Sequence, residues 1–276
     1  MKKYPQFSVL MSVYYKEKAE YLNLALNSIE YQTIKPTEII LVEDGELTSE
    51  LYSVIEQHQK LLKQKLKIVK NKKNKGLGLA LHEGTKHVTT DWIARMDTDD
   101  ISIQNRFELQ LNEIKKNPDI AVIGGQVNEF LTTPQRFVGK RRVPLSQEKI
   151  YEYIKYRNPF NHPTVMINKK KLIDIGGYRN SDRLEDYDLW VRFVERKERL
   201  LNLKNVLVYM RVGTDMYKRR GGLKYLRNYM HMKNNWRKLG VGNYSSMFLS
   251  DILMTANVFM PVKIRKYMYQ KFLHKN

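Results

Sequence analysis

The sequence predicts an α/β fold with a mostly parallel, doubly wound sheet, because strand-length apolar runs alternate with segments of helical spacing through its first half. Short apolar runs are typical of buried strands, whereas apolar residues three and four positions apart indicate helices. The expected strands are 7–13, 38–42, 66–69 and 93–96. The expected helices are 19–31, 49–62 with Ser49 as N-cap, and 78–88.

Length and charge predict a main domain with an elaborated C-terminal part. The chain has 276 residues, enough to bury a full core, and a formal net charge of +20. Residues 197–276 contain 17 lysines and arginines against three acids, so +14 of that charge lies there. An anionic partner is therefore expected to bind the C-terminal part. The absence of cysteine excludes disulfides and thiolate metal sites and suits a reducing compartment.

No segment predicts secretion or membrane crossing. The apolar run at 7–15 is too short for a signal-peptide core and is better interpreted as a strand. The longest apolar candidate for a membrane span, 248–262, is interrupted by Asp251, Asn257 and Pro261. We expect a protein that is soluble or bound to a surface.

Acidic residues follow three of the four expected strands. They lie in the segments 14–17, 43–44 and 97–100. In doubly wound sheets, ligands bind at the carboxyl ends of the strands, so these segments should share one edge of the sheet. A single aspartate would more often cap a helix or lie in a solvated turn. Three aligned acidic segments favour a ligand site.

The run from Asp97 to Asp100 predicts a metal site. Three carboxylates within four residues repel one another and lose hydration at the end of a buried strand. A divalent cation carrying a phosphate would offset both costs. Mg²⁺ or Mn²⁺ prefers oxygen ligands, and Asp97 and Asp99 match that preference. Asp100 is expected either to cap a following helix or to contact the substrate.

A glycine-containing segment, Asn74–Gly84, is a second candidate for phosphate binding. Gly76 and Gly78 precede an expected helix, so backbone amides could face a phosphate, with Lys75 adding positive charge. The segment lacks the Gly-Lys-Ser/Thr of a Walker A loop and the third glycine of the dinucleotide fingerprint. These absences argue against an ATPase and against a nicotinamide-dependent enzyme.

Five motifs in order resemble those of the family 2 glycosyltransferases, which have a GT-A fold. The motifs are Ser8–Tyr14, Glu43–Gly45, Asn74–Gly84, Asp97–Asp100 and Glu185–Trp190. The stretches 158–164 and 219–222 are similar to those of bacterial enzymes that build capsule, exopolysaccharide or O-antigen repeat units. The resemblance implies a GT-A, Rossmann-like sheet with flanking helices, followed here by a C-terminal helical extension.

The resemblance also implies an activity and its site. It implies inverting, metal-dependent transfer of a sugar from a nucleotide-diphosphate donor, expected to be a UDP-sugar, to a hydroxyl of a glycan or lipid-linked oligosaccharide. The expected donor-nucleotide residues are Ser12, Tyr14, Glu17, Asp44, Lys75, Gly76 and Asp97. Asp99 and Asp97 are the expected ligands of Mg²⁺ or Mn²⁺, with Asp97 near the ribose.

The second acidic pair, Glu185 and Asp186, is the candidate for proton transfer. The pair begins a segment with helical spacing, so its acids could simply complement a helix dipole. The resemblance implies instead that Asp186 is the general base, with Glu185 beside it. A base within reach of the acceptor hydroxyl supports a single, inverting displacement.

Two further segments are candidates for diphosphate or acceptor contacts. His162 lies in a turn flanked by prolines and is either a structural hydrogen-bonding residue or a residue near the sugar or acceptor. Arg219 and Arg220 precede two glycines. They could close over the diphosphate and exclude water, or they could belong to a solvated connector.

The C-terminal part contains three amphipathic segments. We expect the apolar stripes of 223–236 and 248–259 to pack on the main domain. The last segment, 262–275, is basic and amphipathic, which suits an anionic membrane surface and would bring the enzyme to a lipid-linked acceptor. The expected domains are therefore 1–210, which binds the nucleotide sugar, and 211–276, in a cytoplasmic enzyme peripheral to the inner face of the membrane.

Two other classes of protein fit part of the sequence. The charge of +20 with interleaved tyrosine and arginine also suits a nucleic-acid-binding protein, but no known nucleic-acid module is recognisable, so no nucleic-acid partner is expected. A sugar nucleotidyltransferase would have a glycine-rich basic loop after its first strand, where this chain has Tyr14, Tyr15 and Lys16. The sequence leaves the oligomeric state open.

Overall fold

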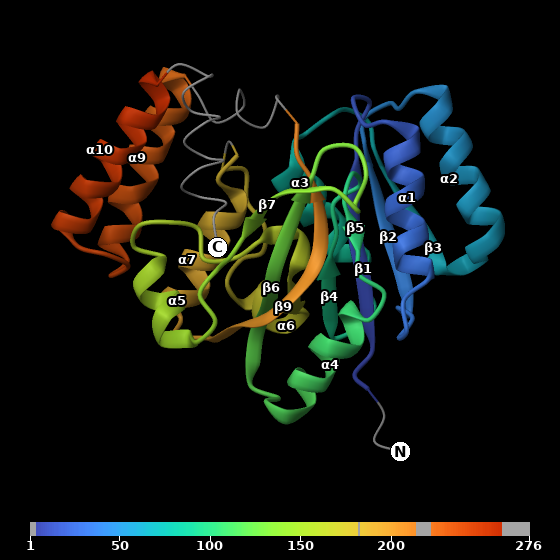
Figure 1. Cartoon of the computed structure of the whole chain (residues 1–276), viewed down its shortest axis with the longest axis horizontal. Coiled ribbons are helices and arrows are strands. Elements are labelled where there is room, and N and C mark those ends of the chain that lie inside the picture. The colour runs from blue at the N-terminus through green and yellow to red at the C-terminus, as the bar shows by residue number, and fades with distance from the viewer. Residues whose placement is uncertain (1–3, 182, 214–221, 261–276) are drawn as a thin grey trace.

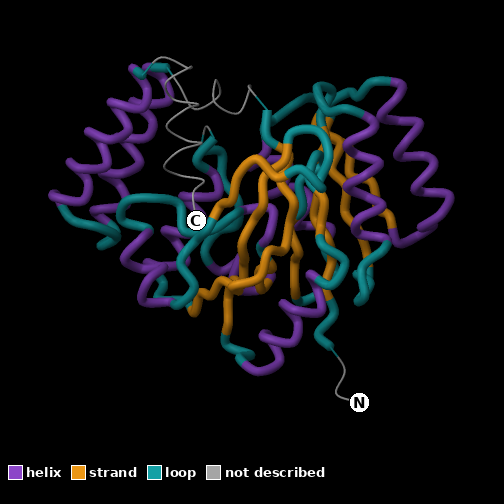
Figure 2. Tube along the Cα trace, viewed as in Figure 1, coloured by secondary structure: helices purple, strands orange, loops and turns teal. Residues whose placement is uncertain are grey.

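One mixed sheet runs through the molecule, with helices on both of its faces (Figures 1 and 2). The structure is a computed structural model, and it describes residues 4–181, 183–213 and 222–260. These residues form a nine-stranded sheet in the order β3-β2-β1-β4-β8-β6-β9-β5, with β7 paired to β6. The strands are β1 (Phe7–Val13), β2 (Glu38–Asp44), β3 (Leu66–Asn71), β4 (Trp92–Arg95), β5 (Ile101–Ser102), β6 (Ile120–Phe130), β7 (Phe137–Arg141), β8 (Met166–Asn168) and β9 (Arg199–Arg211).

The helices cover the sheet and extend the chain at its C-terminal end. They are α1 (Ala19–Glu30), α2 (Ser49–Leu62), α3 (Leu77–His87), α4 (Arg106–Lys116), α5 (Gln147–Tyr153), α6 (Lys169–Asp174), α7 (Glu185–Glu195), α9 (Leu223–Lys238) and α10 (Tyr244–Phe259), with short 3-10 turns η1 (Lys63–Lys65) and η2 (His162–Thr164). Among the described residues, no helix is both long enough and apolar enough to cross a membrane.

The N-terminal half has the predicted parallel architecture. Strand β1 lies between β2 and β4, and β3 continues the sheet beyond β2, all in parallel. The four predicted strands and three predicted helices are present, with ends displaced by one or two residues. The N-cap prediction was wrong by one residue: Ser49 begins α2, and the Thr48 hydroxyl accepts the hydrogen bond from the Leu51 amide at 3.4 Å.

The other half of the sheet mixes strand directions. Strand β8 is antiparallel to both β4 and β6, whereas β6 and β9 run in parallel along most of their length. The short β5 follows the acidic run directly and pairs with β9 in the antiparallel sense. Residues far apart in the sequence, near 100 and near 210, therefore meet at one place.

The core has two layers, one on each face of the sheet. Because side chains alternate along a strand, Leu10 faces one layer and Met11 the other. The first layer contains side chains of α3 and α7, including Leu81 and Trp190. The second contains side chains of α1, α2 and α4, including Phe107. Close-packed side chains thus cover both faces of the sheet, and this packing fixes the positions of the loops at its carboxyl edge.

Helix α9 packs on the main domain, as predicted. The rings of Trp236 and Tyr187 lie 4.5 Å apart, and the Trp236 indole N–H donates to Asp188 Oδ1 at 3.2 Å. Lys233 Nζ donates to the carbonyl of Lys155. These contacts join α9 to α7, the helix that begins with the second acidic pair.

We keep the division of the chain into two domains, 1–210 and 211–276, as a proposal.

Helix α10 differs from the prediction. Its stripe, which includes Phe248, Ile252 and Phe259, is exposed rather than packed on the main domain. Ser246 and Ser250 are its buried residues, because α10 lies outside α9 and contacts it through the opposite face. The predicted basic segment 262–275 lies outside the described residues.

The hydrogen-bonded carboxylate of Glu38 generates a prediction about stability. It accepts from Ser8 Oγ at 2.6 Å and from the Thr89 amide at 2.7 Å, and it pairs with Lys67 at 2.5 Å. Burial acts to raise its pKa, but these contacts together lower the pKa to about 2. The stabilisation is present above a pH of about 4.5 and is lost as the pH falls towards 2. We expect Glu38→Gln to cost about 2–3 kcal/mol at pH 7.

Urea denaturation across this pH range tests the prediction. The difference between the wild type and Glu38→Gln should shrink as the pH falls below about 4.5. Glu43→Gln is the matched control on the same strand, because burial raises the pKa of Glu43 and the favourable charge of Lys70 does not overcome it. As the pH rises, the wild type should therefore lose stability relative to Glu43→Gln but gain stability relative to Glu38→Gln. The same pH trend against both variants would contradict the stabilising role assigned to Glu38.

Candidate active site

Three carboxylates gather where β4 ends. One oxygen each from Asp97, Asp99 and Asp100 lies within 4.8 Å of the others. The guanidinium of Arg95 pairs with Asp97 Oδ1. Asp100 Oδ1 accepts from the Arg211 amide at 2.8 Å, whereas its buried Oδ2 has no hydrogen-bond partner among the described residues. The loop therefore holds several oxygen atoms at the spacing of a cation site.

The electrostatics of the loop favour a bound cation. Burial, and then the neighbouring charges of Asp97 and Glu17, raise the pKa of Asp99 to about 7. Burial, Asp99 and Asp97 also raise the pKa of Asp100. Clustered oxygen ligands with an unsatisfied buried acceptor fit a hard divalent cation such as Mg²⁺ or Mn²⁺. The residues present thus fit the metal that the sequence predicts.

Arg211 holds this loop from the end of β9. Its Nε donates to the Asp99 carbonyl at 3.1 Å, and its guanidinium lies 3.7 Å from the centre of the Tyr21 ring. The predicted helix cap at Asp100 is wrong, because β5 follows rather than a helix, and Asp100 Oδ1 accepts from the Arg211 backbone instead. Substrate contact by Asp100 stays a prediction. Sequence reasoning missed this contact because 111 positions separate the two residues.

The loop after β1 reaches the same place. Thr98 Oγ1 donates to Glu17 Oε2 at 2.8 Å and lies 3.5 Å from the carbonyl of Ser12, at the end of β1. Tyr14 follows and packs edge to face on Tyr15. Burial, and to a smaller extent the nearby Asp97, raise the pKa of Glu17, although two hydrogen bonds, from the Lys18 amide and the Thr98 hydroxyl, oppose the shift. The first and fourth strands thus deliver their acids to one edge, as predicted.

Asp44, at the end of β2, organises the glycine-containing loop. Its Oδ1 accepts from Asn71 Nδ2 at 3.0 Å and from the Lys75 amide at 2.9 Å, and its Oδ2 accepts from the Gly76 amide at 2.9 Å. The expectation that these amides face a phosphate is therefore corrected, because both amides donate hydrogen bonds to the Asp44 carboxylate. Gly76 has a φ of +86°, a conformation that favours glycine, so the turn into α3 depends on it.

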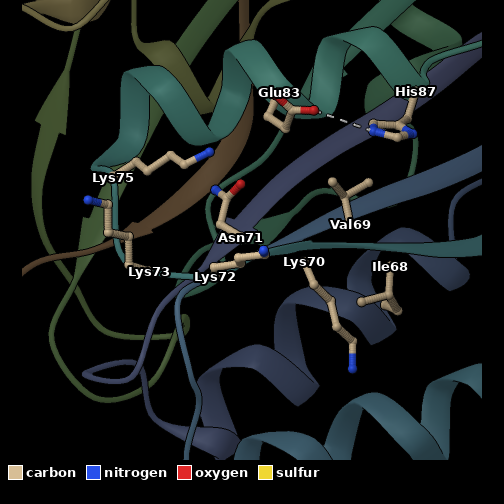
Figure 3. Close-up of a pocket in the computed structure, with 9 residues that line it drawn as sticks. All are labelled: Ile68, Val69, Lys70, Asn71, Lys72, Lys73, Lys75, Glu83 and His87. Atoms are coloured by element: carbon tan, nitrogen blue, oxygen red, sulfur yellow. Dashed lines mark ion pairs between the residues drawn. The ribbon is translucent and has the colours of Figure 1, made fainter.

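Lysines surround a groove beside this loop. Figure 3 shows Lys70, Lys72, Lys73 and Lys75 around the end of β3, with the Glu83–His87 pair of α3 across from them. The sequence analysis singled out only Lys75. The additional lysines make the β3 edge of the sheet positively charged, with β2 and β1 between this edge and β4, which leads into the acidic loop. Such an arrangement suits a ligand that carries phosphates.

The second acidic pair lies in the first turn of α7. Asp186 Oδ2 accepts from Asn158 Nδ2 at 2.6 Å, and its Oδ1 accepts from the Tyr187 amide at 2.8 Å. Burial, and then the charge of Asp186, raise the pKa of Glu185. Sequence reasoning did not identify Asn158 as the partner of Asp186, although it singled out the stretch that contains it.

Gly78 lets α3 approach this turn closely. A Cβ on Gly78 would lie 2.3 Å from the Arg179 carbonyl oxygen and 3.2 Å from the Glu185 Cβ. Only glycine fits so close to a backbone oxygen. The first turn of α3, next to Asp44, is therefore packed against the first turn of α7. This close approach brings the loop that Asp44 orders and the second acidic pair together.

A buried polar group lies between the two acidic sites. Arg95 is only 1% exposed, and its charge bears on His162, Tyr178 and Glu185 as well as on its partner Asp97. His162 Nε2 lies 3.0 Å from the Tyr178 hydroxyl, and its ring packs on Trp190. Burial, together with Arg95, holds the pKa of His162 well below its usual value.

The burial of His162, its contact with the Tyr178 hydroxyl and its packing on Trp190 favour the structural role among the two alternatives, and its contact with the diphosphate, sugar or acceptor stays a prediction. Arg219 and Arg220 lie outside the described residues. Arg95 is a site residue that the sequence analysis missed, although a signal was available. It lies two positions before Asp97 in a buried strand, and residues two apart share one face of a strand.

The family of the chain follows from comparison with known proteins. A model described as glycosyl transferase family 2 matches residues 8–176, more than half of the chain. The chain belongs to glycosyl transferase family 2. Among the three classes that the sequence allowed, this result decides for a glycosyltransferase over a nucleotidyltransferase and a nucleic-acid-binding protein. The acidic loop, the Asp44 loop and the 158–164 segment all lie within the matched range.

This family 2 glycosyltransferase is similar to bacterial enzymes along its whole length. It is 39% identical over 276 residues to a glycosyltransferase of Haemophilus influenzae, covering 98% of this chain and 100% of the relative. It is 36% identical over 271 residues to the Escherichia coli UDP-Gal:alpha-D-GlcNAc-diphosphoundecaprenol beta-1,3-galactosyltransferase, covering 98% of each.

Solved structures confirm the GT-A fold. The mannosyltransferase PcManGT of Pyrobaculum calidifontis, solved with GDP-Man and Mn²⁺, superposes with a TM-score of 0.64 at 14% identity. The match covers 96% of this chain and 72% of that chain. At this level of identity the likeness shows the fold.

The crowded carboxylates generate a prediction about Asp99. Asp99→Asn removes one charge from the cluster, so the variant without metal should melt roughly 2–4 °C higher than the wild type without metal. MnCl₂ should raise the melting temperature of the wild type but have little effect on the variant. Thermal denaturation with and without MnCl₂ measures both effects.

Asp174→Asn is the control for this experiment, because Asp174 is an exposed acid on α6. It should respond to MnCl₂ as the wild type does. A full metal-dependent shift in Asp99→Asn would show that Asp99 is not a ligand.

Proposed function

We propose that this glycosyltransferase is inverting and metal-dependent, and that it moves a sugar from a UDP-sugar to a hydroxyl of a lipid-linked oligosaccharide. The observation that carries the proposal is the placement of two acidic sites around one buried arginine. The loop of Asp97 and Asp99 and the turn of Glu185 and Asp186 both lie within the electrostatic reach of Arg95.

The donor half of the site is the edge formed by β1, β2 and β4. In the proposal, Ser12, Tyr14, Glu17 and Asp44 border the nucleoside, and Asp97 and Asp99 hold the metal beside the diphosphate. A divalent cation there would stabilise the negative charge that develops on the departing diphosphate. The lysines at the end of β3 support the same placement through their positive charge.

The acceptor half is the first turn of α7. We assign Asp186 as the general base because two N–H groups donate to its carboxylate and fix its orientation. Glu185 is less suited to the role, because burial raises its pKa. In one displacement, the acceptor oxygen bonds to the anomeric carbon, its proton passes to Asp186, and the donor diphosphate leaves from the opposite face.

The nature of the substrates is proposed from the relatives. The Escherichia coli enzyme is named for a UDP-Gal donor and a GlcNAc-diphosphoundecaprenol acceptor, and a 36% identical protein of Erwinia amylovora is named for amylovoran biosynthesis. The PcManGT structure contains Mn²⁺. We therefore propose a UDP-sugar donor, Mg²⁺ or Mn²⁺ as the metal, and a role in bacterial exopolysaccharide or O-antigen synthesis at the inner face of the cell membrane.

Substitution of the proposed base separates donor binding from transfer. Asp186→Asn should lower kcat by about 10²–10⁴-fold, because the acceptor hydroxyl loses its base, while the affinity for a UDP-sugar changes little. Calorimetric titration with UDP-galactose and other UDP-sugars measures donor binding. Transfer to a short-chain lipid diphosphate that carries GlcNAc measures kcat.

Glu195→Gln is the control on the same helix, because Glu195 is exposed at the far end of α7. It should leave both donor binding and transfer close to wild type. Full activity of Asp186→Asn would overturn the base assignment. Failure of every UDP-sugar to bind the wild type would overturn the donor.

A further inference from the structure

Helix α10 exposes its large apolar side chains and buries its serines. Phe248 is 68% exposed and Phe259 is 66% exposed, while Ser246 and Ser250 face α9. The other exposed apolar side chains of the helix are Tyr244, Leu249, Ile252 and Leu253. An isolated helix pair in water would be more stable with the opposite orientation. This face is therefore built to be covered.

The exposed arc is continuous and uncharged. At 100° per residue, its side chains occupy one side of α10 from Tyr244 to Phe259, interrupted only by Ser245 and Thr255. The helix has one charged residue, Asp251, which borders this arc next to Tyr244 and interacts with Lys233 of α9. Contiguous apolar patches of this kind on a folded surface mark interaction sites.

The face is held rigidly beside the acceptor half of the site. Helix α10 packs on α9, and its Ser250 hydroxyl approaches the carbonyl of Lys155 at 3.3 Å. Helix α9 in turn packs on α7 through Trp236, Tyr187 and Asp188. Figure 1 shows this helix pair at the end of the molecule opposite α1 and α2, adjoining α7. Whatever α10 contacts is thereby brought near the helix that begins with Glu185 and Asp186.

The charge around the face indicates its partner. Lys224, Arg227 and Lys238 are exposed on α9, and residues 261–276, which follow α10 directly in the chain, contain five lysines and arginines and no acid. A second copy of a chain with a net charge of +20 would be repelled from this basic end. An anionic lipid surface would be attracted to it, and an uncharged apolar face suits acyl chains better than a hydrogen-bonded protein interface.

We propose that the exposed face of α10, formed by Tyr244, Phe248, Leu249, Ile252, Leu253 and Phe259, docks on an anionic phospholipid bilayer. The helix lies in the interface with these side chains among the outer acyl carbons and the basic side chains of α9 at the lipid headgroups. The biological use of this docking rests on the proposed function, since it would bring α7 close to the membrane that holds a lipid-linked acceptor. The binding itself requires neither donor nor acceptor.

Vesicle flotation of the full chain tests the proposal without any sugar substrate. The wild type should float with vesicles of phosphatidylcholine and phosphatidylglycerol, and less with phosphatidylcholine alone. The double variant Phe248→Gln, Ile252→Gln should bind the anionic vesicles at least about tenfold more weakly, because it places two amides in the interface. The control variant Leu61→Gln, Ile173→Gln removes exposed apolar side chains outside the helix pair and should bind as the wild type does.

A second measurement locates the contact even where the double variant folds poorly. Trp92, Trp190 and Trp236 are buried, so the added indole of Phe248→Trp should be the one quenched by brominated lipids. Vesicle binding by the double variant equal to that of the wild type would overturn the proposal. The absence of quenching in Phe248→Trp would also overturn it. A dimer formed by the wild type but not by the double variant would overturn it as well, because the face would then be an interface between two copies of the chain. Because UDP-sugar binding is measured separately, a failure of the docking proposal leaves the proposed chemistry intact, and the reverse also holds.

Discussion

Mutual repulsion among the carboxylates at the end of β4 is the constraint on which the rest of the site depends. Asp97, Asp99 and Asp100 are forced together in a buried setting, which raises the pKa of Asp99 to about 7. Two arginines from different strands keep the group in place. Arg95 pairs with Asp97, whereas Arg211 donates from its side chain to the Asp99 carbonyl and from its backbone to Asp100 Oδ1. A cation between the carboxylates would complete the balance of charge.

Arg95 also lies close to the second acidic site, at the start of α7. Arg95 is buried with Tyr178, which lies in the segment before α7, and with His162, which packs on Trp190 of α7. The close approach at Gly78 holds α3 against the same segment. The two acidic sites are thus joined through buried, packed residues. In the proposed mechanism this packing would fix the distance between leaving group and base, as a single displacement requires.

Amphipathic periodicity was a reliable guide to helices and an unreliable guide to their surroundings. The stripe of α9 packs on α7, as its spacing suggests, yet the equally regular stripe of α10 faces outward. Periodicity reports that one face of a helix is apolar, but it does not report what lies opposite that face. The prediction failed at α10 because this helix packs on α9 with the side that carries Ser246 and Ser250, which leaves its apolar stripe exposed.

The sequence by itself determined the strand and helix order of the N-terminal half, the shared edge for Glu17, Asp44 and Asp97–Asp100, and the family of the chain. These properties depend on local periodicity and on short motifs in order. Only the tertiary structure decided that Arg211 anchors the acidic loop, that Asn158 orients Asp186, and that the amides of Lys75 and Gly76 serve Asp44. Each of these contacts joins residues 28 or more positions apart, where neither spacing nor local propensity carries information about contact.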